Sequence, residues 1–393
     1  MIYPVDKEPL SKWFGLKRSN YVLDPRANEE DALFYARRTS VDINKQITDL
    51  EISLGANLAP KKLYWGTSGG GKTHTIYKLL YELGDRLPII PVLVDCPNMT
   101  KSSTFVVLYQ ETMKKLKMDF VISLLRDVLN DAIKDVGIGN PELAEKKLCE
   151  IMENEDLGRA TYCLTQTRFD IMTLWKWISA AGTTSRERSE LRVTSDLLDA
   201  DPRSLAQILL TFGKLVKKYK KKSLVMAFDE LDRAKGLNVD AAGTFSTAFT
   251  VLTDPTASDI SVFLSTSAER QRDVPAMITK PVLTRLGESI GGIIEIPVMT
   301  PQEVEPFVKD LIKYVRDPGI NIKKLIDLAK TETSEQILED LYPFTKEAIE
   351  SVKLKVGKEI IPRHICMVMS RAASYAKQIE KMHVVTSKSV ENS

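Results

Sequence analysis

The stretch LYWGTSGGGKTHTIYKLL, Leu63 to Leu80, places three consecutive glycines between a short apolar run and a segment with helical spacing. Gly66 to Thr73 within it matches G-x-x-x-x-G-K-[ST] at every fixed position. Residues 61–65 are typical of a buried strand, and the following apolar residues have three–four spacing: Ile76, Leu79, Leu80 and Leu83. Since a strand, a glycine-rich loop and a helix form the context in which this motif binds phosphate, the stretch predicts a nucleotide site.

The residue types of this loop suit a triphosphate. Glycines let the backbone curl so that successive N–H groups point at phosphate oxygens, and the helix that follows adds its positive dipole end. We predict that Lys72 neutralises the β- and γ-phosphates and that the Thr73 hydroxyl binds Mg²⁺. The predicted nucleotide-binding residues belong to the loop and the helix start: Gly66, Thr67, Ser68, Gly69, Gly70, Gly71, Lys72, Thr73 and His74.

A second motif indicates what becomes of the nucleotide. The apolar run Ser223 to Phe228 is typical of a strand buried on both faces, and it ends in Asp229 and Glu230. We predict that Asp229 holds Mg²⁺, directly or through water, and that Glu230 is the general base for the attacking water. A nucleotide kinase needs no carboxylate there to activate water, so the acidic pair favours hydrolysis of ATP. Asp232 is expected at the surface or in a supporting role.

Composition excludes several other classes. Lys and Arg total 55 of 393 residues and Asp and Glu total 53, so the chain has no global basic field of the kind that marks nucleic-acid binders. The 4 cysteines have no CxxC spacing and there are only 3 histidines, which argues against a zinc site, a disulfide framework or a histidine triad. The N-terminus has no secretory signal and no apolar run is long enough to span a bilayer. We therefore expect a soluble cytoplasmic protein with no membrane partner.

The order of these motifs resembles that of the AAA+ ATPases, closest to the origin-recognition/Cdc6-like and STAND-related branch, which includes prokaryotic DNA-handling and phage-defence ATPases. The resemblance implies an α/β fold: a three-layer P-loop NTPase with a parallel sheet, a large helical insertion and a C-terminal all-α lid. It divides the chain into an N-terminal arm, 1–54, a core, 55–299, with the insertion at about 101–203, and a lid, 300–393.

The resemblance also implies roles for residues far from the loop. The strand predicted within 259–269 ends in hydroxyls where the class has its sensor-1 residue; Thr266 is the first candidate, and Ser267 and Ser265 are alternatives. Arg285 matches the arginine finger that acts on a neighbouring subunit. Its rivals for that role are Arg270 and Arg272. Arg363 matches the sensor-2 arginine, which reaches the γ-phosphate from the lid.

Four further segments carry weaker expectations. Thr300 and Pro301 predict a helix start, and Pro362 opens the last long helix. The charged segment Ser185 to Arg192 is expected to be a loop, either solvated or in contact with DNA or a partner. For the lysine run Lys214 to Ser223, we expect a solvated helix end, with a nucleic-acid contact as the alternative. For Arg37 and Arg38, contacts with nucleotide or a subunit and ordinary ion pairs are equally open.

Together these patterns predict a Mg²⁺-dependent ATPase that oligomerises. It would use ATP binding and hydrolysis to switch assembly or to remodel a DNA or DNA–protein complex. One alternative is a STAND-like nucleotide switch that recruits a protein effector, for example in antiviral defence. Another is a nucleotide-binding scaffold with negligible turnover.

Overall fold

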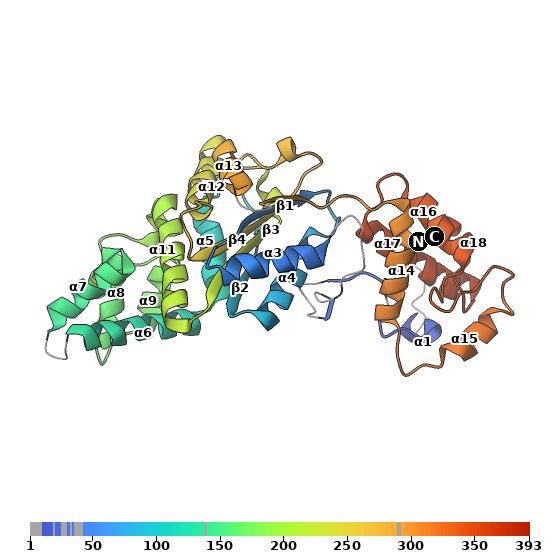
Figure 1. Ribbon diagram of the computed structural model, residues 1–393, viewed down its shortest axis with the longest axis horizontal. Helices are drawn as coiled ribbons and strands as arrows, with labels where there is room; N and C mark the ends of the chain where they lie inside the picture. The colour runs from blue at the N-terminus through green and yellow to red at the C-terminus, as the bar shows by residue number, and fades with distance from the viewer. Residues whose placement is uncertain are drawn as a thin grey trace. The chain divides into compact units, whose positions relative to one another are not determined.

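The computed structural model describes residues 10–18, 20–24, 30–31, 34, 42–136, 140–288 and 292–393 (Figure 1). The chain forms two compact units. The first, here called the sheet unit, spans 46–65 and 82–295; the second, the helical unit, spans 1–45, 66–81 and 296–393. Arg37 and Arg38 lie outside the described residues, so the expectations for them stay predictions.

The sheet unit is built on a five-stranded sheet with the strand order β2-β3-β4-β1-β5. The strands are β1 (Lys61–Gly66), β2 (Ile89–Asp95), β3 (Ser223–Asp229), β4 (Ile260–Ser267) and β5 (Ile293–Glu295). β2 pairs with β3, β3 with β4 and β1 with β5, all in parallel. The predicted α/β fold with a parallel sheet is confirmed, and the carboxyl ends of its strands meet at one edge, where such sheets bind ligands.

Within the described part of the sheet unit, the sheet is accompanied by α3 (Ile43–Gly55), α11 (Pro202–Leu215), α12 (Val239–Leu252) and α13 (Lys280–Glu288). A further helix, α4 (Lys72–Arg86), begins in the helical unit and ends in the sheet unit. β3 is buried along nearly its whole length because its apolar run has neighbours on both faces. Phe228 of β3 packs edge-on against Phe249 of α12 at a ring-centroid distance of 5.8 Å. Asp201 caps α11 through the backbone N–H groups of Arg203 and Ser204, and Pro202 is the first residue of the helix.

The predicted helical insertion between β2 and α11 is confirmed. It contains α5 (Phe105–Leu116), α6 (Met118–Val136), α7 (Pro141–Met152), α8 (Glu155–Tyr162), α9 (Ile171–Ile178) and α10 (Ser185–Leu191). Its apolar faces are buried: Leu125 of α6, Leu148 of α7 and Trp177 of α9 are all fully buried. They belong to the same hydrophobic core as the sheet, so the insertion is an integral part of the sheet unit.

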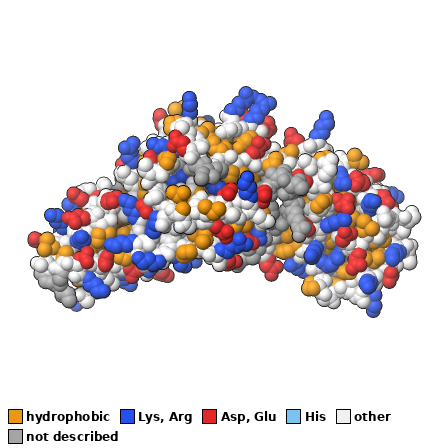
Figure 2. Space-filling model, viewed as in Figure 1, with side chains coloured by type: hydrophobic (Ala, Val, Ile, Leu, Met, Phe, Trp, Pro, Cys, Tyr) orange, Lys and Arg blue, Asp and Glu red, His pale blue; other side chains and the backbone are white. Residues whose placement is uncertain are grey.

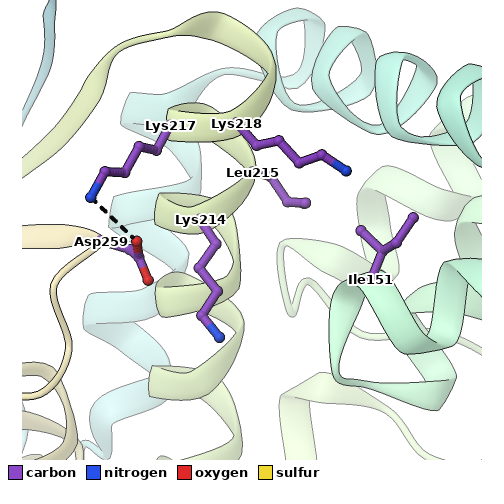
Figure 3. A pocket seen from close by; sticks show the side chains of 6 residues that line it. All are labelled: Ile151, Lys214, Leu215, Lys217, Lys218 and Asp259. Atoms are coloured by element: carbon purple, nitrogen blue, oxygen red, sulfur yellow. Dashed lines mark ion pairs between the residues drawn. The ribbon is translucent and has the colours of Figure 1, made fainter.

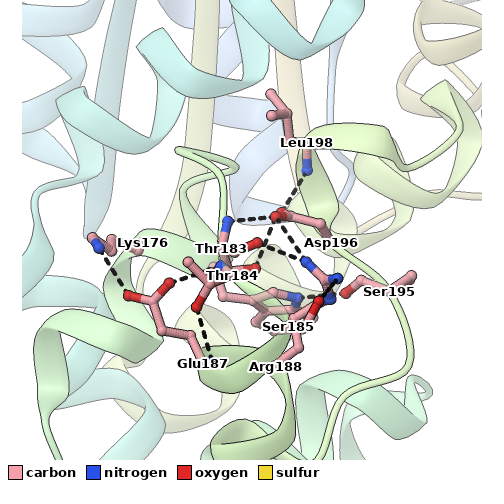
Figure 4. A network of polar contacts seen from close by, with 10 residues as sticks. Lys176, Thr183, Thr184, Ser185, Glu187, Arg188, Ser195, Asp196 and Leu198 are labelled. Atoms are coloured by element: carbon pink, nitrogen blue, oxygen red, sulfur yellow. Dashed lines mark hydrogen bonds and ion pairs between the residues drawn. The ribbon is translucent and has the colours of Figure 1, made fainter.

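The prediction of a loop at Ser185 to Arg192 is wrong, because residues 185–191 form α10. Thr184 and Glu187 make a capping box: the Thr184 hydroxyl accepts from the Glu187 N–H, and the Glu187 carboxylate accepts from the Thr184 N–H at 2.8 Å. Lys176 also donates to Glu187 at 2.8 Å, and this bond is the main reason why the pKa of Glu187 falls to about 2 (Figure 4). The sequence could have predicted this helix, because a Thr followed three residues later by a Glu is typical of a helix start.

The residues around α10 satisfy one another's charges and hydrogen bonds (Figure 4). Buried Asp196 accepts from the Thr183 hydroxyl at 2.8 Å and from the Leu198 N–H at 3.0 Å. Arg188 donates to the Thr183 carbonyl at 2.6 Å and lies 3.8 Å from Asp196. The network favours a structural role for this charged segment over contact with DNA or a partner.

The close approach of α7 and α8 gives a stability prediction. A β-carbon at Gly158 of α8 would lie 2.6 Å from the backbone N of Cys149 in α7. We expect Gly158→Ala to destabilise the chain by about 1–3 kcal/mol through overpacking. Gly243 of α12 is the matched control, since a β-carbon there meets nothing within 4 Å and Gly243→Ala should stabilise by about 0.5–1 kcal/mol. The urea midpoints of the two variants are compared with that of the wild type; equal midpoints would contradict the tight helix contact.

The helical unit contains α1 (Leu10–Phe14), α14 (Pro301–Val315), α15 (Ile322–Ala329), α16 (Lys346–Val356), α17 (Pro362–Tyr375) and α18 (Ser387–Asn392). α14 begins as predicted, with Pro301 as its first residue and the Glu303 carboxylate accepting from the Thr300 N–H at 2.8 Å. The predicted helix start at Pro362 is also confirmed. Among the described residues, no helix combines the length and the apolar character needed to cross a membrane.

The described part of the N-terminal segment packs with the C-terminal helices. Phe14 and Tyr21 are buried in one core with Leu311 of α14 and Met369 of α17. The Trp13 indole donates to the Met382 carbonyl at 2.8 Å, which fixes the start of the chain against a segment 369 residues away. Sequence patterns gave no indication of this pairing.

Candidate functional site

The predicted phosphate loop, residues 66–73, lies between β1, which ends at Gly66, and α4, which begins at Lys72. Three of its glycines have positive φ: Gly66 at 150°, Gly69 at 77° and Gly71 at 104°. A β-carbon at Gly66 would also overlap the carbonyl oxygen of Ile296. The loop conformation therefore requires glycine at Gly69, a position that the motif leaves variable, as well as at Gly66 and Gly71.

Lys72 lies within the loop. Its side chain is 6% exposed, and its ammonium donates to the carbonyls of Gly66 at 3.1 Å and Thr67 at 2.8 Å. A buried ammonium held by two neutral carbonyls is poised to exchange them for phosphate oxygens, which carry charge and form stronger bonds. The Thr67 hydroxyl is also buried and finds no hydrogen-bond partner among the described residues.

The structure brings Arg363 next to this loop. Arg363 is the second residue of α17, and its side chain is exposed. A β-carbon at Gly69 would lie 3.0 Å from Cβ and 3.4 Å from Cδ of Arg363. Arg363, which the resemblance assigns to the sensor-2 position, therefore packs against the glycine loop, and its sensor role stays a prediction.

The acidic pair lies at the carboxyl end of β3. Asp229 is 3% exposed and is in register with Asp95, the last residue of β2. Glu230 follows with a left-handed backbone, φ 57° and ψ 38°. Because that conformation costs a non-glycine residue about 1–2 kcal/mol, such residues cluster at functional sites.

Arg233 contacts Glu230, although sequence reasoning assigned it no role. One of its terminal nitrogens forms an ion pair with Glu230 Oε2, and the other donates to the Cys96 carbonyl at 2.8 Å. The Cys96 thiol is fully buried, and burial raises its pKa to about 12, so it is not a nucleophile of this site. In the sequence, only the three-residue spacing between Glu230 and Arg233 could have indicated this ion pair, since it brings the two side chains together in a helical turn.

The polar residues at the end of β4 lie at the same edge of the sheet. Thr266 and Ser265 are fully buried, and their hydroxyls find no hydrogen-bond partner among the described residues. The Asp232 carboxylate, expected at the surface or in a supporting role, accepts from the Ser267 N–H at 2.9 Å. Two buried unsatisfied hydroxyls are what a ligand or an ordered water would complete.

The structure does not bring Arg285 to the acidic pair of its own chain. Arg285 of α13 donates to the Thr250 carbonyl and forms an ion pair with Asp254 at 3.1 Å. Asp254 precedes β4, so Arg285 lies near the amino end of that strand, whereas Asp229 and Glu230 lie at the carboxyl edge. The rivals Arg270 and Arg272 follow the carboxyl end of β4 instead.

The lysine run predicted as a solvated helix end lines an open groove of about 420 Å³ beside α7 (Figure 3). Its ammonium groups pair with acidic side chains: Lys214 with Glu153 at 2.7 Å, Lys217 with Asp259 at 3.7 Å and Lys218 with Asp131 at 3.0 Å. Exposed pairs of this kind contribute about 0–1 kcal/mol each. The pairing supports the interpretation of the run as a solvated helix end.

No protein-family model and no curated protein matches the sequence. Solved structures of similar fold include the Aeropyrum pernix ORC1 protein in complex with DNA, at 10% identity and a TM-score of 0.46, covering 92% of this chain and 65% of that one. Cdc6p from Pyrobaculum aerophilum has 13% identity and a TM-score of 0.44, with 91% and 68% covered. The Drosophila ORC bound to DNA has 12% identity and a TM-score of 0.45, with 100% and 68% covered.

These structures are of the class that the sequence motifs resemble. The chain spans 65% to 68% of their length. Because the identities are low and the TM-scores lie below 0.5, the likeness concerns the fold, and we argue function from the chain's own residues.

Proposed function

We propose that the chain is a Mg²⁺-dependent ATP hydrolase whose nucleotide cycle controls its assembly. The observation that carries the proposal is the glycine loop after β1, with Lys72 held inside it by two loop carbonyls. Glu230 follows β3 of the same parallel sheet, so both motifs leave the sheet at its carboxyl edge.

The residues present fit ATP and Mg²⁺. The backbone N–H groups of the loop and the Lys72 ammonium would bind the phosphates, and the Thr73 hydroxyl and the Asp229 carboxylate would hold the metal. The described residues contain no group of three or more His, Cys, Asp or Glu side chains placed to hold a metal by themselves. A hydroxyl and one carboxylate, completed by waters and phosphate oxygens, is the usual protein share of such a Mg²⁺ site. The metal would neutralise charge on the phosphates.

Glu230 would accept the proton of the attacking water, and Arg363 would bind the γ-phosphate from the start of α17. The buried Thr266 hydroxyl would orient the water or a phosphate oxygen. This proposal gives partners to the hydroxyls of Thr67 and Thr266, which are otherwise buried without any among the described residues.

Arg285 would act on the nucleotide of a neighbouring copy. Its distance from the acidic edge of its own sheet unit supports this role, since a second chain is then needed to bring a guanidinium to the γ-phosphate. For this, the ion pair between Arg285 and Asp254 would have to open. Both side chains are about one-third exposed, so the free energy needed to separate them is small. Turnover would therefore depend on assembly.

Mixing two inactive variants tests this shared site. Glu230→Gln chains keep the arginine and lose the base, whereas Arg285→Ala chains keep the base and lose the arginine. We expect the mixture to hydrolyse ATP several-fold faster than either variant alone, because hybrid neighbours restore complete sites. Glu230→Gln mixed with the Glu230→Gln/Arg285→Ala double variant is the control and should stay inactive. A mixed rate equal to the average of the two components contradicts action in trans.

The partner on which assembly acts would be DNA or a DNA–protein complex. A protein effector is the second candidate, and the ion pairs of Lys214 in α11 and of Lys218 just after it favour it. Figure 2 also shows basic and acidic side chains interspersed over the face that it draws. ATP turnover is measured with and without duplex DNA, alongside the mass of the ATP-bound assembly. Stimulation that weakens with salt supports DNA, and turnover indifferent to DNA supports the protein effector.

A further inference from the structure

A lysine is buried at the start of β1, in the interior of the sheet unit. Lys61 is the first residue of this strand and is only 1% exposed. Its side-chain nitrogen donates to two backbone carbonyls, that of Ala257 at 3.0 Å and that of Ile260. Ala257 lies in the turn 253–259 between α12 and β4, and Ile260 is the first residue of β4. Lys61 therefore connects the start of β1 to the start of β4.

The number of acceptors around Lys61 suits a neutral amine better than an ammonium. An ammonium carries three N–H donors, whereas a neutral amine carries two. Within the described residues, the nitrogen donates to two acceptors, the carbonyls of Ala257 and Ile260. A third N–H would be buried without a partner among these residues, which is costly, whereas the two N–H groups of the amine are both satisfied.

The carboxylates that act on Lys61 are already paired with other cations. Asp254 pairs with Arg285 of α13 at 3.1 Å, and Asp259 pairs with Lys217, just after α11, at 3.7 Å. Burial outweighs the attraction of both carboxylates and lowers the pKa of Lys61 from 10.5 to about 7. The side chain therefore changes its charge close to neutral pH.

We propose that Lys61 is a buried proton-binding site that makes the contact between β1 and the turn 253–259 sensitive to pH. In its neutral form the side chain satisfies both carbonyls. Uptake of a proton places a charge and an additional donor where almost no solvent reaches. The inference is independent of the proposed function, because none of the measurements that test it involves a nucleotide.

The sign of the pH dependence follows from the proton that each state binds. Between about pH 7 and 10.5, Lys61 is protonated in the unfolded chain and neutral in the folded chain. The free energy of unfolding therefore rises with pH across this window. Below it both states carry the proton, and above it neither does, so the contribution of Lys61 is constant in both ranges.

Urea unfolding from about pH 6 to 10 tests this in the wild type, Lys61→Met and Lys222→Met. Three of the four tryptophans, Trp65, Trp175 and Trp177, lie in the sheet unit, so their fluorescence reports its unfolding. The unfolding equilibrium constant of the wild type, relative to that of Lys61→Met, should fall about tenfold per pH unit between about pH 8 and 10. Lys222→Met removes an exposed lysine just before β3 and should follow the wild type. Parallel pH profiles of the wild type and Lys61→Met would overturn the proposal.

Lysine NMR is a second measurement, and it decides the matter if Lys61→Met fails to fold. With the wild-type lysines labelled at ¹³Cε, one signal should titrate with a midpoint near pH 7 and should persist in Lys62→Met. Lys62 is the matched control because it is also buried, at 3% exposure, and burial lowers its pKa as well. The proposal is wrong if no lysine signal titrates below about pH 9, or if the signal vanishes in Lys62→Met.

Discussion

Glu230→Gln is expected to lower ATP turnover at least about a hundredfold while leaving ATP binding within twofold of wild type. General-base catalysis contributes about 10²–10⁴ in rate, and an amide of the same shape cannot take a proton from water. Binding should persist because the phosphates are held by the loop after β1 and by Lys72. The measurements are phosphate release at saturating Mg²⁺ and ATP, and the Kd of a fluorescent ATP analogue.

A matched control separates this effect from the loss of any surface carboxylate. Glu155→Gln removes an exposed acid of α8 that also pairs with an arginine, Arg159, and should leave turnover unchanged. If Glu230→Gln hydrolyses ATP as fast as the wild type, the assignment of Glu230 as the base is wrong. If it loses binding instead, Glu230 contributes to the nucleotide site in another way.

Lys72→Ala is expected to weaken ATP binding by about a hundredfold, as the loss of charge-assisted bonds to phosphate oxygens predicts. The lysine is buried and already points at the loop carbonyls of Gly66 and Thr67, so no neighbouring side chain takes its place. Calorimetric titration with a non-hydrolysable ATP analogue and Mg²⁺ measures the change.

Arg86→Ala is the control for Lys72→Ala, since it removes a cation from the same helix. Arg86 ends α4 and pairs with Glu51 and Glu82 at the surface. Its loss should change the Kd for the analogue less than twofold. Binding by Lys72→Ala that equals binding by the wild type would show that the loop is not the phosphate site.

The strands of the sheet were predictable because a parallel sheet buries both faces of a strand and so requires apolar runs such as Ser223 to Phe228. The phosphate loop and the acidic pair were equally visible, since each follows its strand directly in the chain. Local chemistry fixed the starts of α11 and α14, where Asp201 and Thr300 precede a proline.

What escaped prediction depends on residues that meet only in the folded chain. The tie from Arg233 to Cys96 spans 137 positions, and the Trp13 bond to Met382 spans 369. The partner of Arg285, Asp254, lies in the loop between α12 and β4, and no periodic pattern links the two. α10 is the exception, because Thr184 and Glu187 have the spacing of a capping box and could have been recognised in the sequence. The segment was predicted as a loop because most of its residues are charged or polar.

The most direct measurement of the central claim is single-turnover hydrolysis of γ-labelled ATP by the wild-type chain, with Mg²⁺ and with EDTA. Lys72→Ala and Glu230→Gln are run beside it. The account predicts release of labelled phosphate with Mg²⁺ and none above the uncatalysed rate with EDTA. It also predicts a bound but uncleaved nucleotide in Glu230→Gln and about a hundredfold weaker binding in Lys72→Ala. Phosphate release that is equal in all three chains, or absent from a wild type that holds ATP, would contradict it.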